Sequence, residues 1–142
     1  MLRFLMILIL VATPGFAQAP SSVQPYHKVG DTLRYTVVFD GDPNFSSVSL
    51  YFSTPSAPPA DQAGLAQNFG INKTQKLGPG KFEVEGTIPD NIASGSYVLA
   101  DIQPRIAPNG VKDYDAREFH QGFDVENPAK YEFPPLKDVK PE

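Results

Sequence analysis

The sequence contains no cysteine and no tryptophan, and its only two methionines are Met1 and Met6. Without cysteine the chain cannot form a disulfide, a thiolate nucleophile, a zinc–thiolate or iron–sulfur site, or a lipid link through a cysteine. A blue-copper centre is excluded for the same reason, because its copper requires a cysteine ligand. The lack of tryptophan makes a carbohydrate-stacking surface less favoured without excluding it.

Positive charge is also scarce, since 12 basic side chains stand against 16 acidic ones and the formal net charge is −4. No block of lysine and arginine stands out along the chain. Nucleic acids and anionic membrane surfaces both attract positively charged protein surfaces. We therefore expect neither of them as a partner.

Only one long apolar run occurs, from Phe4 to Ala12, between Arg3 and the helix-breaking segment 13–15. The run is about half of the roughly 20 residues that a membrane-spanning helix needs. It is typical of a secretory signal peptide over residues 1–17, with cleavage after Ala17. We expect a secreted mature chain, periplasmic or extracellular, with no membrane span after cleavage.

Fifteen prolines and eleven glycines divide the rest of the chain into short segments that alternate apolar and polar residues. Such alternation is typical of half-buried antiparallel strands. The clearest strands are expected at 31–39, 48–53 and 81–88, with others within 24–29 (an edge strand), 71–77, 97–106 and 112–125. The pattern predicts an all-β protein, an antiparallel β-sandwich of about seven strands.

Three local features refine this expectation. The alternation slips within 97–106, which predicts a β-bulge near Ala100-Asp101. A tight turn over 107–110 is expected, because Asn-Gly tolerates positive φ. In the last strand the expected inward side chains are Phe119, Phe123 and Val125.

Two segments do not alternate. Residues 54–68 are rich in proline and alanine, with a helical turn expected over 61–67, so this connection is either functional or loosely ordered. The proline-rich, charged segment 128–142 is expected to leave domain 18–127 as an extended or disordered arm. Within it, residues 131–136 either dock into a partner's groove or fold back over an edge of the domain.

Several runs resemble bacterial immunoglobulin-like and fibronectin-III-like modules. The run 80–84, the pair Ile88-Pro89 and the run 94–99 follow one another as in those modules, and 30–33 resembles the start of their second strand. The resemblance extends from Val29 to Val125. It implies an immunoglobulin-like sandwich, a fold that hosts many functions.

By this resemblance, Tyr97 takes the position of the tyrosine corner, whose hydroxyl bonds to nearby backbone. Leu99 stands where an antibody domain has a cysteine. Both residues are therefore expected to be structural.

The residues for catalysis are few. The only histidines are His27 and His120, and no Gly-x-Ser-x-Gly motif accompanies them. We interpret His120 as a solvent-facing strand residue rather than part of a triad. Glu83 and Glu85 share a strand face about 7 Å apart, and a solvated sheet face explains this pair better than a glycosidase site. We therefore expect no enzyme and no catalytic residues.

A metal site is a lesser alternative. Aspartates occur in turns and at the expected bulge, and closely spaced carboxylates in loops are typical calcium ligands. The candidates are Asp40, Asp42, Asp101, Asp113 and Asp115. Because the EF-hand spacing is absent and aspartate is an ordinary turn former, we expect no cofactor, with calcium as the one alternative.

The remaining candidate is a binding surface with aromatic anchors. Tyr51, Tyr114, Tyr131 and Phe133 lie outside obvious core positions. The expected function is a non-catalytic domain that contacts another envelope or extracellular protein. The alternatives are a carbohydrate-binding module that uses exposed tyrosines, with or without calcium, and a small hydrolase that depends on His120.

Overall fold

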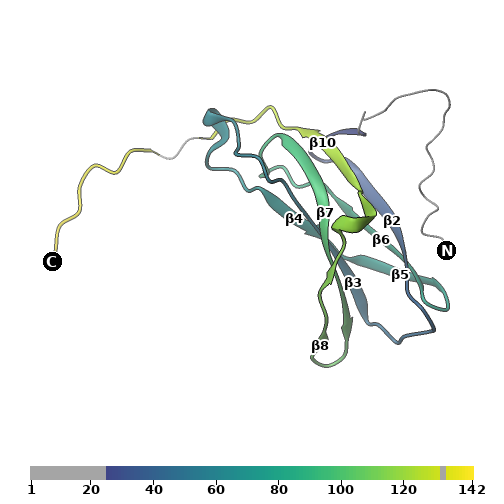
Figure 1. Ribbon diagram of the computed structural model, residues 1–142. Coiled ribbons are helices and arrows are strands. Elements are labelled where there is room, and N and C mark those ends of the chain that lie inside the picture. The colour runs from purple at the N-terminus through teal and green to yellow at the C-terminus, as the bar shows by residue number, and fades with distance from the viewer. Residues whose placement is uncertain (1–24, 132–133) are drawn as a thin grey trace, which may run out of the picture.

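The structure, a computed structural model, describes residues 25–131 and 134–142 (Figure 1). The expected signal peptide, residues 1–17, lies outside the described residues. The described residues form ten strands in two sheets, so the expected all-β, sandwich-like fold is confirmed. None of the helices in these two ranges is long and apolar enough to span a membrane.

The larger sheet has the strand order β1-β10-β7-β3-β4, and β8 and β9 also pair with β7. Its strands are β1 (Tyr26–Lys28), β3 (Ser47–Ser53), β4 (Asn68–Ile71), β7 (Gly95–Ile106), β8 (Gly110–Val111), β9 (Tyr114–Asp115) and β10 (Gly122–Glu126). The smaller sheet has the order β2-β6-β5, from β2 (Thr32–Val38), β5 (Lys73–Gly78) and β6 (Lys81–Thr87). Neighbouring strands are antiparallel except β1 and β10, which run parallel.

The core lies between the two sheets. Alternation along β3 buries Val48, Leu50 and Phe52 completely, and β6 likewise buries Phe82 and Val84. The Phe52 ring stacks on Phe69 at 5.2 Å and lies 5.2 Å from Phe123, so one aromatic cluster joins β3, β4 and β10. Removing these rings from water stabilises the core.

Most expected strands occur, including the edge strand within 24–29, which is β1. The predicted bulge is confirmed: Tyr51 pairs with Asp101 and Phe52 pairs with Leu99, so Ala100 is the additional residue. The bulge allows both Leu99 and Ile102 to point inward.

The strand expected over 71–77 is confirmed from Lys73 on, as β5, but its start differs. Its residues belong to β4 and β5, which lie in different sheets, with Asn72 at the crossing. Ile71, whose side chain is buried, is the last residue of β4 in the larger sheet. Three positions later, Thr74 pairs with Val84 in the smaller sheet.

The strand expected within 112–125 is confirmed only at its end, as β10, and the segment is not one continuous strand. The chain instead forms β8, β9, the short 3₁₀ turn η3 (Arg117–Phe119) and β10. Phe123 and Val125 are buried as predicted, but Phe119 is 43% exposed because η3 lifts it off the sheet. His120 does not lie in a strand; it ends η3 in the left-handed conformation, with φ 52° and ψ 41°.

The chain reverses after β7 as expected, but by a different turn. Ala107-Pro108 is a cis peptide bond, and His120 is the only non-glycine residue with positive φ among those described. Asn109 and Gly110 therefore do not form the positive-φ turn that the sequence predicts.

Candidate functional site

The centre of β7 is where the larger sheet becomes irregular. On the side facing β3, Ala100 is the bulged residue. On the other side, residues 116–121 leave the ladder between β9 and β10, and they are held by hydrogen bonds from Ala116 N to Ala100 O (2.8 Å) and from Leu99 N to Gln121 O (2.9 Å). Both irregularities therefore occur at one level of β7, a position at which bulges commonly redirect side chains toward a binding site.

An open hollow of about 350 Å³ lies at this level. We call it the outer hollow; its lining residues are Tyr51, Phe52, Ser53, Asn68, Ala100, Asp101, Gln103 and Arg117. They come from β3, β4, β7 and η3. Two residues that the sequence analysis assigned to different sites, the aromatic Tyr51 and the metal candidate Asp101, thus lie together.

The ring of Tyr51 lies on the neighbouring strand β4. Tyr51 pairs with Gly70, and a Cβ atom at Gly70 would lie 2.8 Å from both Cδ1 and Cε1 of that ring. Only glycine leaves this space free, because any side chain at position 70 would displace the ring. The ring is therefore held close to the sheet, with its side chain only half-buried.

The charges beside the outer hollow partly compensate one another. Asp101 and Asp115 are direct cross-strand partners, and like charges in such a pair repel. Arg117 offsets this repulsion: its Nη1 lies 3.3 Å from Asp115 Oδ1, and its backbone N–H donates to the same oxygen at 3.0 Å. The pair is well exposed, so it contributes little stability and leaves the guanidinium accessible.

A second feature is the concentration of exposed apolar side chains after β7. Ten large apolar side chains are exposed among the described residues, and four of them lie between positions 106 and 119: Ile106 (50%), Val111 (52%), Tyr114 (39%) and Phe119 (43%). Ile106 pairs with Gly110 and Arg105 pairs with Val111, so Ile106 and Val111 stand on opposite faces of the hairpin. Figure 1 shows the β7–β8 hairpin extending from the rest of the sheet.

The sequence predicted only Tyr114 from this group. Its ring lies 5.9 Å from Phe39 and carries Lys112 Nζ at 5.3 Å, so it is partly an extension of the core. Ile106, Val111 and Phe119 were missed because a strand pattern assigns apolar residues to the interior. The neighbouring polar residues Asn68, Gln103 and Arg117 were also missed, and only Gln103 carried a signal, as an outward position once the bulge is placed.

The five aspartates proposed for calcium do not form one site. Asp42 Oδ1 lies 2.6 Å from Lys76 Nζ, and this hydrogen bond lowers the pKa of the Asp42 carboxyl. Asp101 and Asp115 pair with each other on β7 and β9 of the larger sheet. Within 25–131 and 134–142, no three histidine or acidic side chains converge as a metal site would require.

Tyr131 lies at the start of the expected arm, and here the chain folds back onto its own domain. The backbone of Tyr131 receives a hydrogen bond from Gly64 N (3.2 Å) and donates one to Asp61 O (2.7 Å). The Tyr131 ring occupies the position that a Cβ at Gly64 would take. Residues 128–131 are therefore packed against the connection between β3 and β4 instead of extending away, whereas Phe133 lies outside the described residues.

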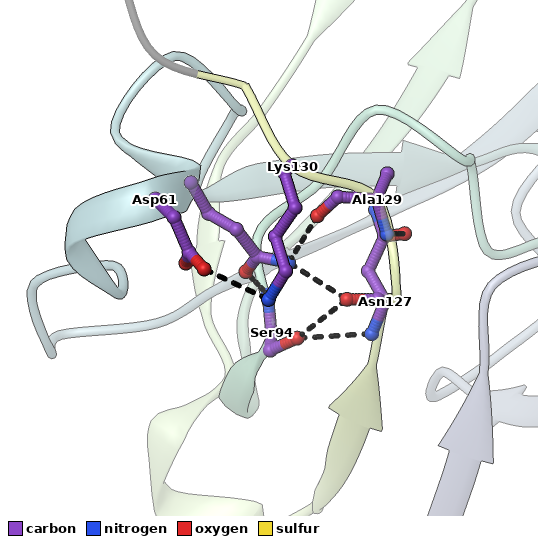
Figure 2. A network of polar contacts seen from close by, with 6 residues as sticks. Asp61, Ser94, Asn127, Ala129 and Lys130 are labelled. Atoms are coloured by element: carbon purple, nitrogen blue, oxygen red, sulfur yellow. Dashed lines mark hydrogen bonds and ion pairs between the residues drawn. The ribbon is translucent and has the colours of Figure 1, made fainter.

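The same connection carries a polar network that we call the polar clasp, built on Gln62, Ser94 and Asn127 (Figure 2). Gln62 is 1% exposed; its Nε2 donates to the carbonyls of Asn127 and Ala129, both at 2.7 Å, and its Oε1 accepts from Ser94 N at 2.8 Å. Lys130 adds an ion pair to Asp61 at 2.8 Å, which lowers the pKa of the Asp61 carboxyl.

Asn127 completes the clasp from the other side. Its Nδ2 donates to the carbonyls of Asp90 (3.0 Å) and Ile92 (2.7 Å), and its Oδ1 accepts from Ala129 N (2.9 Å). The 54–68 connection is thus ordered by hydrogen bonds. It contains the 3₁₀ turn η2 (Ala60–Gln62) in place of the helical turn expected over 61–67.

Tyr97 and Leu99 lie in the core. Tyr97 is fully buried, and its hydroxyl donates to the carbonyl of Ala93 at 2.7 Å. Burial raises the pKa of Tyr97 to about 12. Leu99 is 4% exposed and belongs to the same core.

The residues considered for catalysis are separated. His27 Nδ1 lies 3.3 Å from Asp31, and its ring edge meets Phe123, whereas His120 is exposed at the end of η3. No serine hydroxyl of the described ranges bonds to either histidine. Glu83 and Glu85 both pair with Arg34, at 3.6 and 3.4 Å.

Neither a protein-family model nor a curated protein matches this chain.

Proposed function

We propose that the chain is an immunoglobulin-like or fibronectin-III-like module that acts without catalysis by binding another protein of the cell envelope or extracellular space. In an immunoglobulin-type sandwich, strands B, E and D share one sheet and strands C, F and G share the other. The orders β2-β6-β5 and β3-β7-β10 match this arrangement. The hydrogen bond from Tyr97 to Ala93 matches the tyrosine corner. Secretion rests on the sequence of residues 1–17 alone.

The observation that carries the binding function is the set of exposed apolar side chains between β7 and β10. Ile106 and Val111 present apolar surface on both faces of one hairpin, and aromatic and aliphatic side chains of this kind act as anchors at protein interfaces. Arg105 and Lys112 stand beside them, and neither forms an ion pair with a described residue. The fitting partner is a protein cleft with apolar walls and carboxylates at its rim.

A lipid surface is the weaker explanation for the same hairpin. Arg105 and Lys112 would each contribute about 1 kcal/mol to the free energy of binding an anionic membrane. The tip of the hairpin, between Ile106 and Val111, contains the polar Asn109. Such a hairpin has too little apolar surface to anchor a protein in a bilayer by itself.

The test compares two pairs of exposed apolar residues. The full-length sequence is expressed, and the purified product is immobilised and offered native envelope extract. A double variant Ile106→Ser/Val111→Ser should lose a partner protein that the wild type retains. The control Val38→Ser/Leu77→Ser removes residues of similar exposure, 48% and 46%, and should retain it. Equal retention by the two double variants would exclude the hairpin as the anchor.

A further inference from the structure

The polar side chains of the outer hollow are not used by the rest of the described structure. The side chains of Tyr51, Asn68, Asp101 and Gln103 form no hydrogen bond or ion pair with another residue of the described ranges. Arg117 has one partner, the exposed Asp115. With the Ser53 hydroxyl, which also lines the hollow, six polar side chains there have bonding capacity available to a ligand.

The chemistry of these groups selects a neutral ligand rich in hydroxyls. The Asn68 and Gln103 amides can both donate and accept, as the Tyr51 hydroxyl can, while Asp101 accepts and Arg117 donates. Asp101 and Arg117 line the hollow, and Asp115 beside it pairs with Arg117, so an anion is disfavoured there while the amide and hydroxyl groups suit a neutral ligand. Vicinal hydroxyls, which each donate and accept, match such a mixed lining.

Tyr51 adds an apolar ring to this polar lining. Gly70 leaves room for this ring to lie against β4, and Tyr51 is one of the residues that line the hollow. An aromatic ring combines an apolar face with a polar hydroxyl, which suits the C–H and O–H groups of a sugar.

The size of the hollow limits the ligand. The hollow is open to solvent, so a small ligand would lie against it with one face, and a folded peptide segment such as a helix needs a longer groove. From the lining, the charge balance and the size, we propose that the outer hollow binds a neutral hexopyranose unit of a glycan. The proposal uses none of the four exposed apolar side chains that carry the protein-binding function, so each can fail alone.

The test is a titration of the isotope-labelled, full-length product, followed by amide chemical shifts in NMR spectra. The probes are maltohexaose, cellohexaose and the hexamer of N-acetylglucosamine. At least one should produce saturable shifts at Ser53, Asn68 and Gln103, with a Kd of about 1 mM or tighter. Gln103→Ala and Arg117→Ala should each weaken that affinity about tenfold.

The matched control is Gln75→Ala, because Gln75 is an exposed glutamine on β5 of the other sheet. This variant should bind as the wild type does. The proposal is overturned if none of the three probes gives saturable shifts, if the shifts centre on the β7–β8 hairpin, or if Gln103→Ala and Gln75→Ala bind equally well. Spectra of each variant without glycan show whether its fold is retained.

Discussion

Gln62 and Gln103 carry the same amide group in two different settings. In the polar clasp, Gln62 is buried, and its amide satisfies two carbonyls and one backbone N–H. In the outer hollow, Gln103 is half-buried and has no side-chain partner in the described part of the chain. Buried polar groups stabilise a fold only when they are fully bonded, whereas accessible groups without partners are suited to a ligand. The clasp therefore stabilises the fold, and the free side chains of the hollow support the binding role proposed for it.

The largest expected effect is on the clasp. Asn127→Ala removes two donors and one acceptor, and it leaves the carbonyl of Ile92 and the N–H of Ala129 without their bonds. We expect a loss of about 3 kcal/mol in the free energy of unfolding, measured by urea denaturation. Asn72→Ala is the control, because Asn72 is exposed at the crossing between the sheets; a similar loss in both variants would contradict the role of the clasp.

A smaller effect is expected at alkaline pH from two tyrosines, the half-buried Tyr35 and the fully buried Tyr97. Burial raises the pKa values of Tyr35 and Tyr97 from 10.0 to about 12. Between these values the unfolded chain releases phenolic protons that the folded chain retains, so stability is constant below pH 10 and falls as the pH rises toward 12. In Tyr35→Phe the fall should be shallower, as followed by urea denaturation at stepped pH. If the free energy of unfolding of Tyr35→Phe fell with pH as steeply as that of the wild type, Tyr35 would not contribute to the fall.

The sequence predicted the strands whose two faces differ most. In β2, β3 and β6 the apolar residues of the inner face are more buried than most of their polar neighbours, although Ser49 of β3 is buried as well. The bulge at Ala100 was predictable as well, because Leu99 and Ile102 must both reach the core across an odd step.

The parts that the sequence did not predict depend on contacts distant along the chain. The crossing at Asn72 between the two sheets leaves no periodic pattern in the sequence. The segment 116–121, which places Arg117 at the outer hollow, leaves none either. The clasp joins Gln62 to Asn127 and Ala129, which lie 65 and 67 positions further along the chain. In the sequence its members look like ordinary loop residues, because polarity normally indicates exposure.

The most direct test of the central comparison is the free energy of unfolding of Gln62→Ala and Gln103→Ala, measured side by side with the wild type. Gln62→Ala removes three hydrogen bonds of a fully buried amide, those to the Asn127 and Ala129 carbonyls and from the Ser94 N–H, and should lose about 2 to 3 kcal/mol. Gln103→Ala should stay within about 0.5 kcal/mol of the wild type, as is usual for surface positions. Equal losses would contradict the assignment of the clasp to stability and the hollow to binding.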